Sequence, residues 1–260
     1  MGKMKQTAKV ISQEILADGI YSMWIQTDGI AVQAKQGQFI AVYCNDGTKI
    51  LPRPISLCEV DKENDRLRIV YRVVGGGTTE FSTYEAGDDI EIMGPLGNGF
   101  ALEEKSAILV AGGICIPPMV QLARALKESG VEKISIVVGY RNEDTFLVKE
   151  LESLGTVYLA TEDGSLGTKG NVVDAIKANA LDLDAVMYAC GPTPMLRALK
   201  NLALEHDMRC YLSMEEKMAC GIGACLACVC KSKEVDGHSH VHNKRICKDG
   251  PVFECREIEL

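Results

Sequence analysis

Long apolar runs are missing from this 260-residue sequence. A membrane-spanning helix needs about 18 or more consecutive apolar residues, so we expect no transmembrane segment. The first residues, MGKMKQTAKVISQEIL, contain no apolar stretch of the kind that signal peptides carry. They also lack the Ser or Thr that N-myristoylation requires, since Gln6 stands at that position. We therefore expect a cytoplasmic protein.

Positive charge and aromatic side chains are also scarce. The formal net charge is -8, and aromatic residues make up 5% of the chain. A surface that binds nucleic acid needs a basic excess, so this composition argues against a nucleic-acid partner. Hydrophobic residues make up 47%, which is enough for packed cores. The length allows one or two domains plus an appendage.

Short segments rich in β-branched residues fill the first hundred positions, separated by Asp, Gly and Asn. They predict strands at residues 8–16, 20–27, 38–45, 66–74 and 88–97, and one helix at 78–87. Closely spaced strands without long helices are typical of a barrel or sandwich. We assign this β domain to residues 1–102.

Strands and helices alternate in the next part of the chain. Apolar runs predict strands at 107–114, 133–140, 156–161 and 185–192, and helical periodicity predicts helices at 117–130, 144–155, 169–180 and 193–207. Such alternation indicates a doubly wound sheet of parallel strands. We assign this α/β domain to residues 103–210. Residues 211–260 show no regular pattern.

Cysteine is abundant, with eleven residues, and four of them fall within KMACGIGACLACVCK. Because a cytosolic setting keeps thiols reduced, clustered cysteines there bind metal more often than they form disulfides. Cys220, Cys225 and Cys228 have the C-x4-C-x2-C spacing of plant-type ferredoxins, which hold a [2Fe–2S] cluster with a fourth cysteine from elsewhere. Cys247 is the best-placed fourth ligand. Gly221 and Gly223 would let the loop fold tightly around the cluster.

Other interpretations of these cysteines are structural zinc, a thioredoxin-type redox pair and packed thiols. Structural zinc usually takes two paired ligand sets, whereas Cys225 and Cys228 form the only C-x2-C pair here. That pair does not open a helix in a βαβ unit, as a thioredoxin motif should. Cys230 is not required by the spacing and is expected to be packed. The histidines of HSHVH (His238, His240 and His242) are expected in an exposed turn or strand rather than as ligands.

Three stretches are candidates for binding nucleotides. Arg53 and Ser56 could contact a diphosphate and a ring nitrogen from one extended segment. VVGGGTTEF ends a strand in glycines and opens a helix, which suits an anion, but a plain turn capped by Thr78 is the better explanation of this stretch taken alone. Gly112 and Gly113 follow a buried strand and would let backbone approach a pyrophosphate. The fingerprint G-x-G-x-x-G is absent, so this glycine pair could equally serve a tight turn.

Several motifs together carry a resemblance to a known family. PRPISL, IMGPLGNGF, EDGSLGTKGNV, CGPTPML, MEEKMACGIGAC and CKDGPVF are similar to the electron-transfer subunits of class 1B dihydroorotate dehydrogenases, in the ferredoxin–NAD(P) reductase superfamily. The resemblance spans nearly the whole chain. It implies an FAD-binding antiparallel β-barrel, a doubly wound NAD domain and a C-terminal [2Fe–2S] region.

The resemblance also implies which residues bind each cofactor. FAD would contact Arg53, Pro54, Ile55, Ser56, Val70, Tyr71 and Arg72, with Gly77 and Thr78 at its phosphate. The cluster would be ligated by Cys220, Cys225, Cys228 and Cys247. NAD would lie over Gly112, Gly113 and the stretch from Cys190 through Gly191 to Pro192. Cys115 stands where the family usually has glycine, near the approach of the nicotinamide.

The implied activity is electron transfer in pyrimidine biosynthesis. Dihydroorotate would be oxidised on FMN in a separate catalytic subunit, and electrons would pass through the [2Fe–2S] cluster and FAD to NAD+. The two subunits would form a heterotetramer with two copies of each. No side chain of this chain is expected to act as acid or base on the substrate. The alternatives are an NAD(P)H reductase serving ferredoxin or a sulfide-oxidising partner, and a zinc-bound interaction module on a degenerate reductase fold.

Overall fold

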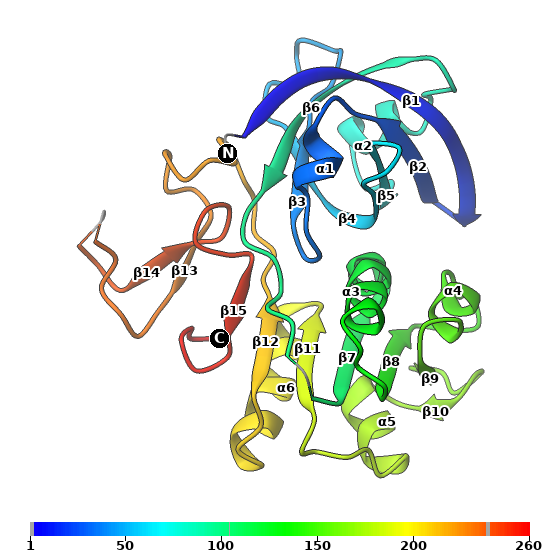
Figure 1. Cartoon of the computed structure of the whole chain (residues 1–260), viewed down its shortest axis with the longest axis vertical. Helices are drawn as coiled ribbons and strands as arrows, with labels where there is room; N and C mark the ends of the chain where they lie inside the picture. Colours follow the sequence, from blue (N-terminus) through cyan, green and yellow to red (C-terminus); the bar gives the residue numbers. More distant parts are fainter. Residues whose placement is uncertain (1–2, 104, 238–239) are drawn as a thin grey trace.

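The computed structural model describes residues 3–103, 105–237 and 240–260, and it contains a barrel, a layered α/β domain and a region beside both (Figure 1). The barrel is closed, with strand order β1-β2-β5-β4-β3-β6 and antiparallel pairing throughout. Its strands are β1 (Met4–Ala17), β2 (Ile20–Gln26), β3 (Phe39–Val42), β4 (Arg53–Asp61), β5 (Arg66–Arg72) and β6 (Asp89–Leu96). The predicted antiparallel β-barrel is therefore confirmed.

Two elements of the barrel were missing from the sequence-based prediction. Strand β4 begins at Arg53 and contains Pro54, a residue that normally argues against a strand. Around Pro54, β4 pairs with β3, and its pairing with β5 begins only at Leu57. The missing amide proton of Pro54 therefore costs no hydrogen bond to β5. Helix α1 (Ile30–Gln33) is a single turn, too short to show periodicity. The predicted helix at 78–87 is α2 (Gly76–Phe81), which ends earlier.

A seven-stranded sheet of order β10-β9-β8-β7-β11-β12-β15 forms the second domain. Its strands are parallel except β15. They span β7 (Ala107–Gly112), β8 (Ile134–Tyr140), β9 (Thr156–Thr161), β10 (Thr168–Lys169), β11 (Val186–Cys190), β12 (Cys210–Ser213) and β15 (Val252–Glu254). The order reverses between β7 and β11, which confirms the doubly wound arrangement. Ligands bind such sheets at this switch point, outside the carboxyl ends of the strands.

Helices cover both faces of this sheet. The 3-10 turn η1 (Gly113–Cys115), α3 (Pro117–Glu128) and α4 (Val148–Glu152) pack on one face, and α5 (Val172–Ala178) and α6 (Thr193–Glu205) on the other. Buried apolar residues of α3 include Met119, Leu122, Ala123 and Leu126, the helical repeat seen in the sequence. Among the described residues, no helix is long and apolar enough to cross a membrane.

The C-terminal part is more regular than the sequence indicated. Strands β12 and β15 extend the parallel sheet, and β13 (Val229–Lys231) pairs with β14 (Asn243–Arg245) in a small hairpin. These strands are short, which is why their pattern was not recognised. The expected boundary between residues 210 and 211 falls inside β12. In Figure 1 the hairpin lies to one side of both the barrel and the sheet.

The barrel is tied to the sheet domain by a buried arginine. Arg68 of β5 makes two hydrogen bonds to the carboxylate of Glu150 in α4, at 2.6 and 3.1 Å. The Arg68 side chain is only 7% exposed and also binds the Ser22 hydroxyl at 2.9 Å. Gln121 of α3 accepts the amide of Val60 in β4. The two domains therefore meet through specific polar contacts as well as apolar ones.

Candidate functional site

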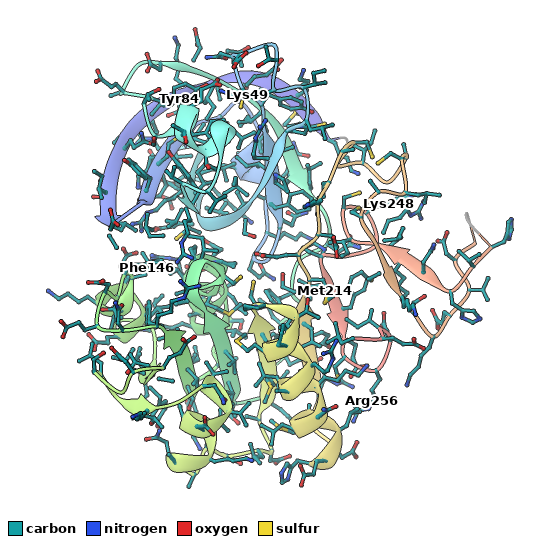
Figure 2. All side chains as sticks on the ribbon, turned by 180° about the vertical axis from the view of Figure 1, so that it is seen from behind. Lys49, Tyr84, Phe146, Met214, Lys248 and Arg256 are labelled. Atoms are coloured by element: carbon teal, nitrogen blue, oxygen red, sulfur yellow. The ribbon has the colours of Figure 1, made fainter. Side chains whose placement is uncertain are left out.

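A cleft of about 590 Å³ lies between the barrel and the sheet domain. This size is typical of cofactor sites. Its lining includes most of the residues predicted for the flavin: Arg53, Pro54, Ile55, Ser56, Val70, Tyr71, Arg72 and Thr78. The sheet domain adds Ile114 and Pro117, and residues 213–218 form a further wall. Figure 2 shows one of these wall residues, Met214, where the three parts of the chain meet.

Gly77 is the one predicted flavin residue outside this lining, and it determines where Arg53 lies. A Cβ atom built on Gly77 would stand 1.9 Å from Nε of Arg53 and 2.4 Å from its Cζ. The missing side chain therefore leaves the space that the guanidinium occupies. Nη1 of Arg53 also donates to the carbonyl of Leu51 at 2.5 Å. Arg53 is thus held over the start of α2, beside the cleft.

Thr78 serves the turn before α2. Its hydroxyl oxygen accepts the amides of Val74 (2.9 Å) and Gly75 (3.2 Å). It also donates to the carbonyl of Gly75 at 3.0 Å. The sequence left open whether this stretch is a capped turn or an anion site. The structure shows the turn, with Thr78 at the edge of the cleft.

Tyr71 contributes differently from its neighbours on β5. Its ring is 1% exposed, stacks with Tyr21 and donates through the phenol to Gln13 at 2.7 Å. Burial raises the pKa of the Tyr71 phenol above its usual value. Side chains alternate along a strand, so Val70 and Arg72 point out of the barrel where Tyr71 points in. The ring of Tyr71 therefore packs in the barrel core, although the residue is also part of the cleft lining.

The four cysteines predicted as cluster ligands come together as two pairs. The Cys225 side chain is close enough to Cys220 to lower its pKa, and the Cys228 side chain is close enough to Cys247 to raise its pKa. The amide of Cys247 donates to Sγ of Cys228 at 3.4 Å. This pairing suits a [2Fe–2S] cluster, because the four cysteine ligands of such a cluster bind its two irons in two pairs. Cys228 and Cys247 are buried in the core, whereas Cys225 is exposed.

Backbone amides surround the first of these sulfurs. Ile222 and Ala224 donate to Sγ of Cys220 at 3.5 and 3.3 Å. Burial favours the thiol, but the amide bonds from Ile222, Cys225 and Ala224 outweigh it and lower the pKa of Cys220 to about 6. The thiolate is the form that binds metal. For Cys247, burial and the neighbouring Cys228 raise the pKa to about 12.

The glycines of this loop have the conformations that the sequence suggested. Gly221 and Gly223 have φ values of 67° and 85°, in the region that favours glycine. A Cβ on Gly223 would also meet the side chain of Lys248 at 2.6 Å. Sequence reasoning missed Arg245, whose Nη1 donates to the carbonyl of Gly223 at 3.4 Å. Its guanidinium also binds both carboxylate oxygens of Asp249, so it joins the loop to the segment that carries the fourth cysteine.

Cys230 and the two described histidines of this stretch, His240 and His242, do not join the four sulfurs. Cys230 lies on β13, and burial raises its pKa to about 11, so it stays protonated near neutrality. His240 and His242 are exposed, and Nδ1 of His242 contacts the carbonyl of Lys233 at 2.9 Å. His238 lies outside the described residues. The exposed position expected for His240 and His242 is confirmed.

The residues predicted for NAD lie at the switch point of the sheet, beside the cleft. Gly112 ends β7, Gly113 opens η1, and Gly191 follows β11. A Cβ on Gly191 would meet Cε of Met195 at 2.0 Å, and one on Gly112 would meet its Sδ at 3.2 Å. The absence of side chains at these two glycines leaves space for Met195 of α6. Close packing against Met195 explains why glycine stands at both positions as well as contact with a bound ligand would.

Two cysteines at this switch point, Cys115 and Cys190, stand singly in the sequence, each beside apolar residues. The structure instead brings Cys115 and Cys190 together with Glu215. Hydrogen bonding to Cys190, burial and the charge of Glu215 raise the pKa of the Cys115 thiol far above its usual value. Cys210 and Cys255 form a second thiol pair, fully buried between β12 and the end of β15. No sequence spacing could have indicated either pair.

One continuous segment joins the cleft to the cysteine loop. Residues 213–218 line the cleft, and Cys220 follows two positions later. The loop also contacts the barrel, because a Cβ on Gly221 would lie 3.4 Å from Leu96 and Met93 of β6. Asn98, just after β6, donates to the carbonyls of Lys248 (3.2 Å) and Asp249 (2.9 Å). The loop is thus held directly against the barrel.

The barrel, the parallel sheet with its switch point and the four-cysteine loop together define an oxidoreductase of the ferredoxin-reductase type. The family model "Oxidoreductase NAD-binding domain" matches residues 109–201. A chain from the structure of NADH-dependent reduced ferredoxin–NADP oxidoreductase, a system of flavin-based electron bifurcation, is 29% identical. It superimposes with a TM-score of 0.87, covering 98% of this chain and 90% of that one.

The particular family follows from the C-terminal region and from whole-chain relatives. Residues 215–259 match the family model "Iron-sulfur cluster binding domain of dihydroorotate dehydrogenase B". The electron transfer subunit of dihydroorotate dehydrogenase B (NAD(+)) from Bacillus cereus is 41% identical, over 98% of this chain and 99% of its own length. That of Bacillus mycoides is 40% identical over the same shares. The chain belongs to the family of dihydroorotate dehydrogenase B electron transfer subunits, as its motifs predicted.

Proposed function

We propose that this chain is the electron-transfer subunit of an NAD-dependent dihydroorotate dehydrogenase, acting in pyrimidine biosynthesis in the cytoplasm. Its partner is a catalytic subunit that oxidises dihydroorotate on FMN, in a heterotetramer with two copies of each chain. The supporting observation is the segment 213–218, which lines the cleft and leads directly to Cys220. It places the cysteine loop next to the cleft, as an electron path requires.

Three parts of the chain would hold three groups: FAD in residues 1–102, NAD in 103–210 and the [2Fe–2S] cluster in 211–260. When bound, the cluster carries single electrons, and the flavin combines two of them into hydride transfer with NAD+. Cys220, Cys225, Cys228 and Cys247 would ligate the cluster. The thiol pairing and the amide bonds to Cys220 fit that role.

Arg53 and the backbone around Gly77 and Thr78 would hold the flavin diphosphate. The space left at Gly77 fits this role, because it allows the guanidinium to lie against the turn before α2. Ser56 and Ile55 line the cleft on β4, and Val70 and Arg72 line it on β5. Gly112, Gly113 and Gly191 would face NAD at the switch point, next to the Ile114 and Pro117 wall of the cleft.

The exposed side of the cysteine loop supports a docked partner. Cys225 is exposed, and Ile222 and Leu226 beside it are 43% and 37% exposed. Apolar side chains around a redox centre shield it from water once a partner covers them. The catalytic subunit would therefore dock on the side of Cys225, opposite the buried Cys228 and Cys247.

Reconstitution tests this function. The chain, loaded with FAD and cluster, would be mixed with an FMN-containing catalytic subunit, and dihydroorotate-dependent reduction of NAD+ would be followed. We expect activity with both subunits together and none with this chain alone. Intact cofactors and a stable complex without NAD-linked dihydroorotate oxidation would refute the proposal.

A reductase that serves ferredoxin is the second candidate. The 29% identity to a chain of ferredoxin–NADP oxidoreductase over nearly the whole length favours it. That candidate predicts NAD(P)H-driven reduction of ferredoxin, or of a sulfide-oxidising partner, without any FMN subunit. The same protein preparation distinguishes the two candidates by the acceptor it reduces.

A further inference from the structure

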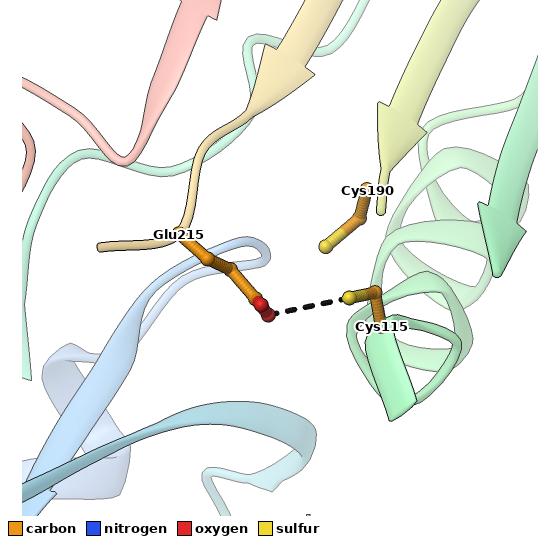
Figure 3. A group of neighbouring side chains, drawn as sticks. All are labelled: Cys115, Cys190 and Glu215. Carbon is orange, nitrogen blue, oxygen red and sulfur yellow. Dashed lines mark hydrogen bonds between the residues drawn. The ribbon is translucent and has the colours of Figure 1, made fainter. Parts of the chain in front are cut away.

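Cys115, Cys190 and Glu215 form a compact group outside the cysteine loop (Figure 3). Their two sulfurs and a carboxylate oxygen all lie within 4.8 Å of one another. Sγ of Cys115 donates to Oε1 of Glu215 at 3.3 Å. The three residues come from three elements: η1 after β7, the end of β11, and the segment after β12.

The group lies where an ion could enter from the cleft. Glu215 is exposed and lines the cleft, whereas Cys115 and Cys190 are 4% and 1% exposed beneath it. β7 and β11 are neighbouring parallel strands, with Cys190 opposite Ala111, so their carboxyl ends hold the two thiols side by side. The carboxylate is reachable from water, and the thiols are shielded from it.

The ligand types select a thiophilic ion. Zinc binds sulfur at about 2.3 Å and carboxylate oxygen at about 2.0–2.2 Å, in tetrahedral geometry that puts ligand atoms roughly 3.5–3.8 Å apart. The group spans at most 4.8 Å, so a contraction of about 1 Å by side-chain rotation would suffice. Two thiolates disfavour magnesium and calcium, which prefer oxygen.

We propose that Cys115, Cys190 and Glu215 bind one divalent cation of the zinc and cadmium type. On binding, the two thiols release their protons to solvent, and the two thiolates and the carboxylate become ligands of the ion. The fourth tetrahedral position is left to water on the cleft side. The site is separate from the four cysteines of the cluster loop.

This ion would obstruct the nicotinamide, a consequence that rests on the proposed function. The group stands at the switch point, where doubly wound sheets bind their ligands. Bound metal would fix the Glu215 side chain between the cleft and the ends of β7 and β11. Hydride exchange between NADH and the flavin would then be inhibited, while the cluster side stays accessible.

Metal stoichiometry of the protein loaded with FAD and cluster tests the site. The protein would be dialysed against buffered Zn²⁺ or Cd²⁺, and bound metal and iron would be measured by mass spectrometry. We expect one added metal ion per chain with no loss of iron, and a thiolate-to-cadmium absorption band. Cys115→Ala and Glu215→Gln should each weaken binding at least tenfold.

Cys255→Ala is the matched control, because it removes one thiol of the buried Cys210–Cys255 pair, which is not part of the cleft lining. It should keep the full stoichiometry. An added ion that persists in Cys115→Ala, or appears only as iron is lost, would overturn the proposal. So would wild-type protein that binds no added ion.

A second measurement separates this site from the proposed function. Bleaching of the flavin by NADH would be followed with and without zinc, each variant being compared with its own metal-free rate. We expect at least tenfold slowing in wild type, reversal by a chelator, and no slowing in Cys115→Ala. If NADH failed to reduce the flavin of metal-free protein, the proposed function would be contradicted. The stoichiometry test of the metal site would still be valid.

Discussion

At the scale of single residues, the four cluster cysteines differ in their surroundings. Cys228 and Cys247 are part of the hydrophobic core, whereas Cys220 receives backbone amides near the surface. Cys230 is half-buried on β13 and keeps its proton because burial raises its pKa. The four predicted ligands therefore lie in two kinds of environment, and Cys230 beside them is a packed thiol.

Replacing Cys247 with Ser should remove the cluster and leave flavin binding intact. A hydroxyl binds iron less strongly than a thiolate does, and Cys247 is held beside Cys228 in the core. Iron content and the visible absorption spectrum would be measured, with FAD assayed after release. Cys230→Ser is the matched control and should keep both irons. A full cluster in the Cys247 variant would contradict the ligand assignment.

Gly77→Ala should weaken FAD binding by roughly tenfold, which corresponds to about 1.4 kcal/mol. The added methyl group would overlap Nε of Arg53 and push the guanidinium away from the turn. Gly75→Ala is the control, because nothing lies within 4 Å of its Cβ position and its backbone is extended. Titration of the FAD-free protein with FAD would measure both. Equal affinities would show that the position of Arg53 does not matter.

At the scale of elements, β5 and α4 are joined by an ion pair across the two domains. The Arg68 side chain is 7% exposed and the Glu150 side chain 39%. Arg68 also lies 3.6 Å from the carboxylate of Glu59, so it keeps a partial partner if Glu150 is lost. This pair holds α4 against the barrel.

Glu150→Gln should lower the free energy of unfolding by about 1–2 kcal/mol, because the charged Arg68 then faces a neutral amide in place of a carboxylate at a half-exposed position. Urea unfolding of the loaded protein would measure this change. Lys133→Ala breaks the exposed pair with Asp182 and should leave stability almost unchanged, because solvent screens that pair. Equal effects of the two substitutions would show that the contact between domains adds no stability.

At the scale of the whole molecule, the cluster region is fastened to the barrel by Asn98. Its side chain donates to the carbonyls of Lys248 and Asp249, and its amide donates to Gly250 at 2.6 Å. Gly97 also packs against Pro251, since a Cβ there would lie 2.5 Å from that proline. These contacts fix the segment that follows Cys247 against the end of β6.

Asn98→Ala should speed iron release to a chelator about fivefold, since loss of the two side-chain hydrogen bonds favours local opening by about 1 kcal/mol. The rate of iron release would be followed by absorbance of the chelate. Asn64→Ala, which alters only a turn of the barrel near Asp61, should release iron at the wild-type rate. An unchanged rate in the Asn98 variant would mean that this contact does not retain the cluster.

The sequence by itself determined the order of the three parts of the chain. It also predicted the set of cluster ligands. Alternating apolar runs and amphipathic helices predicted the sheet, because periodicity is a local property of the chain. The spacing of Cys220, Cys225 and Cys228 is local too. Strand β4 and hairpin β13–β14 escaped prediction, since short strands and a strand with Pro54 depend on their neighbours for pairing.

Only the tertiary structure decided which distant residues meet. Arg53 lies over Gly77, Arg245 holds the cluster loop, and Tyr71 points into the barrel. Cys115, Cys190 and Glu215 are up to 100 positions apart in the chain, yet they meet because the carboxyl ends of β7, β11 and β12 share one edge. Local patterns determine elements, whereas contacts between distant residues arise from the packing of those elements, and no spacing in the sequence encodes them.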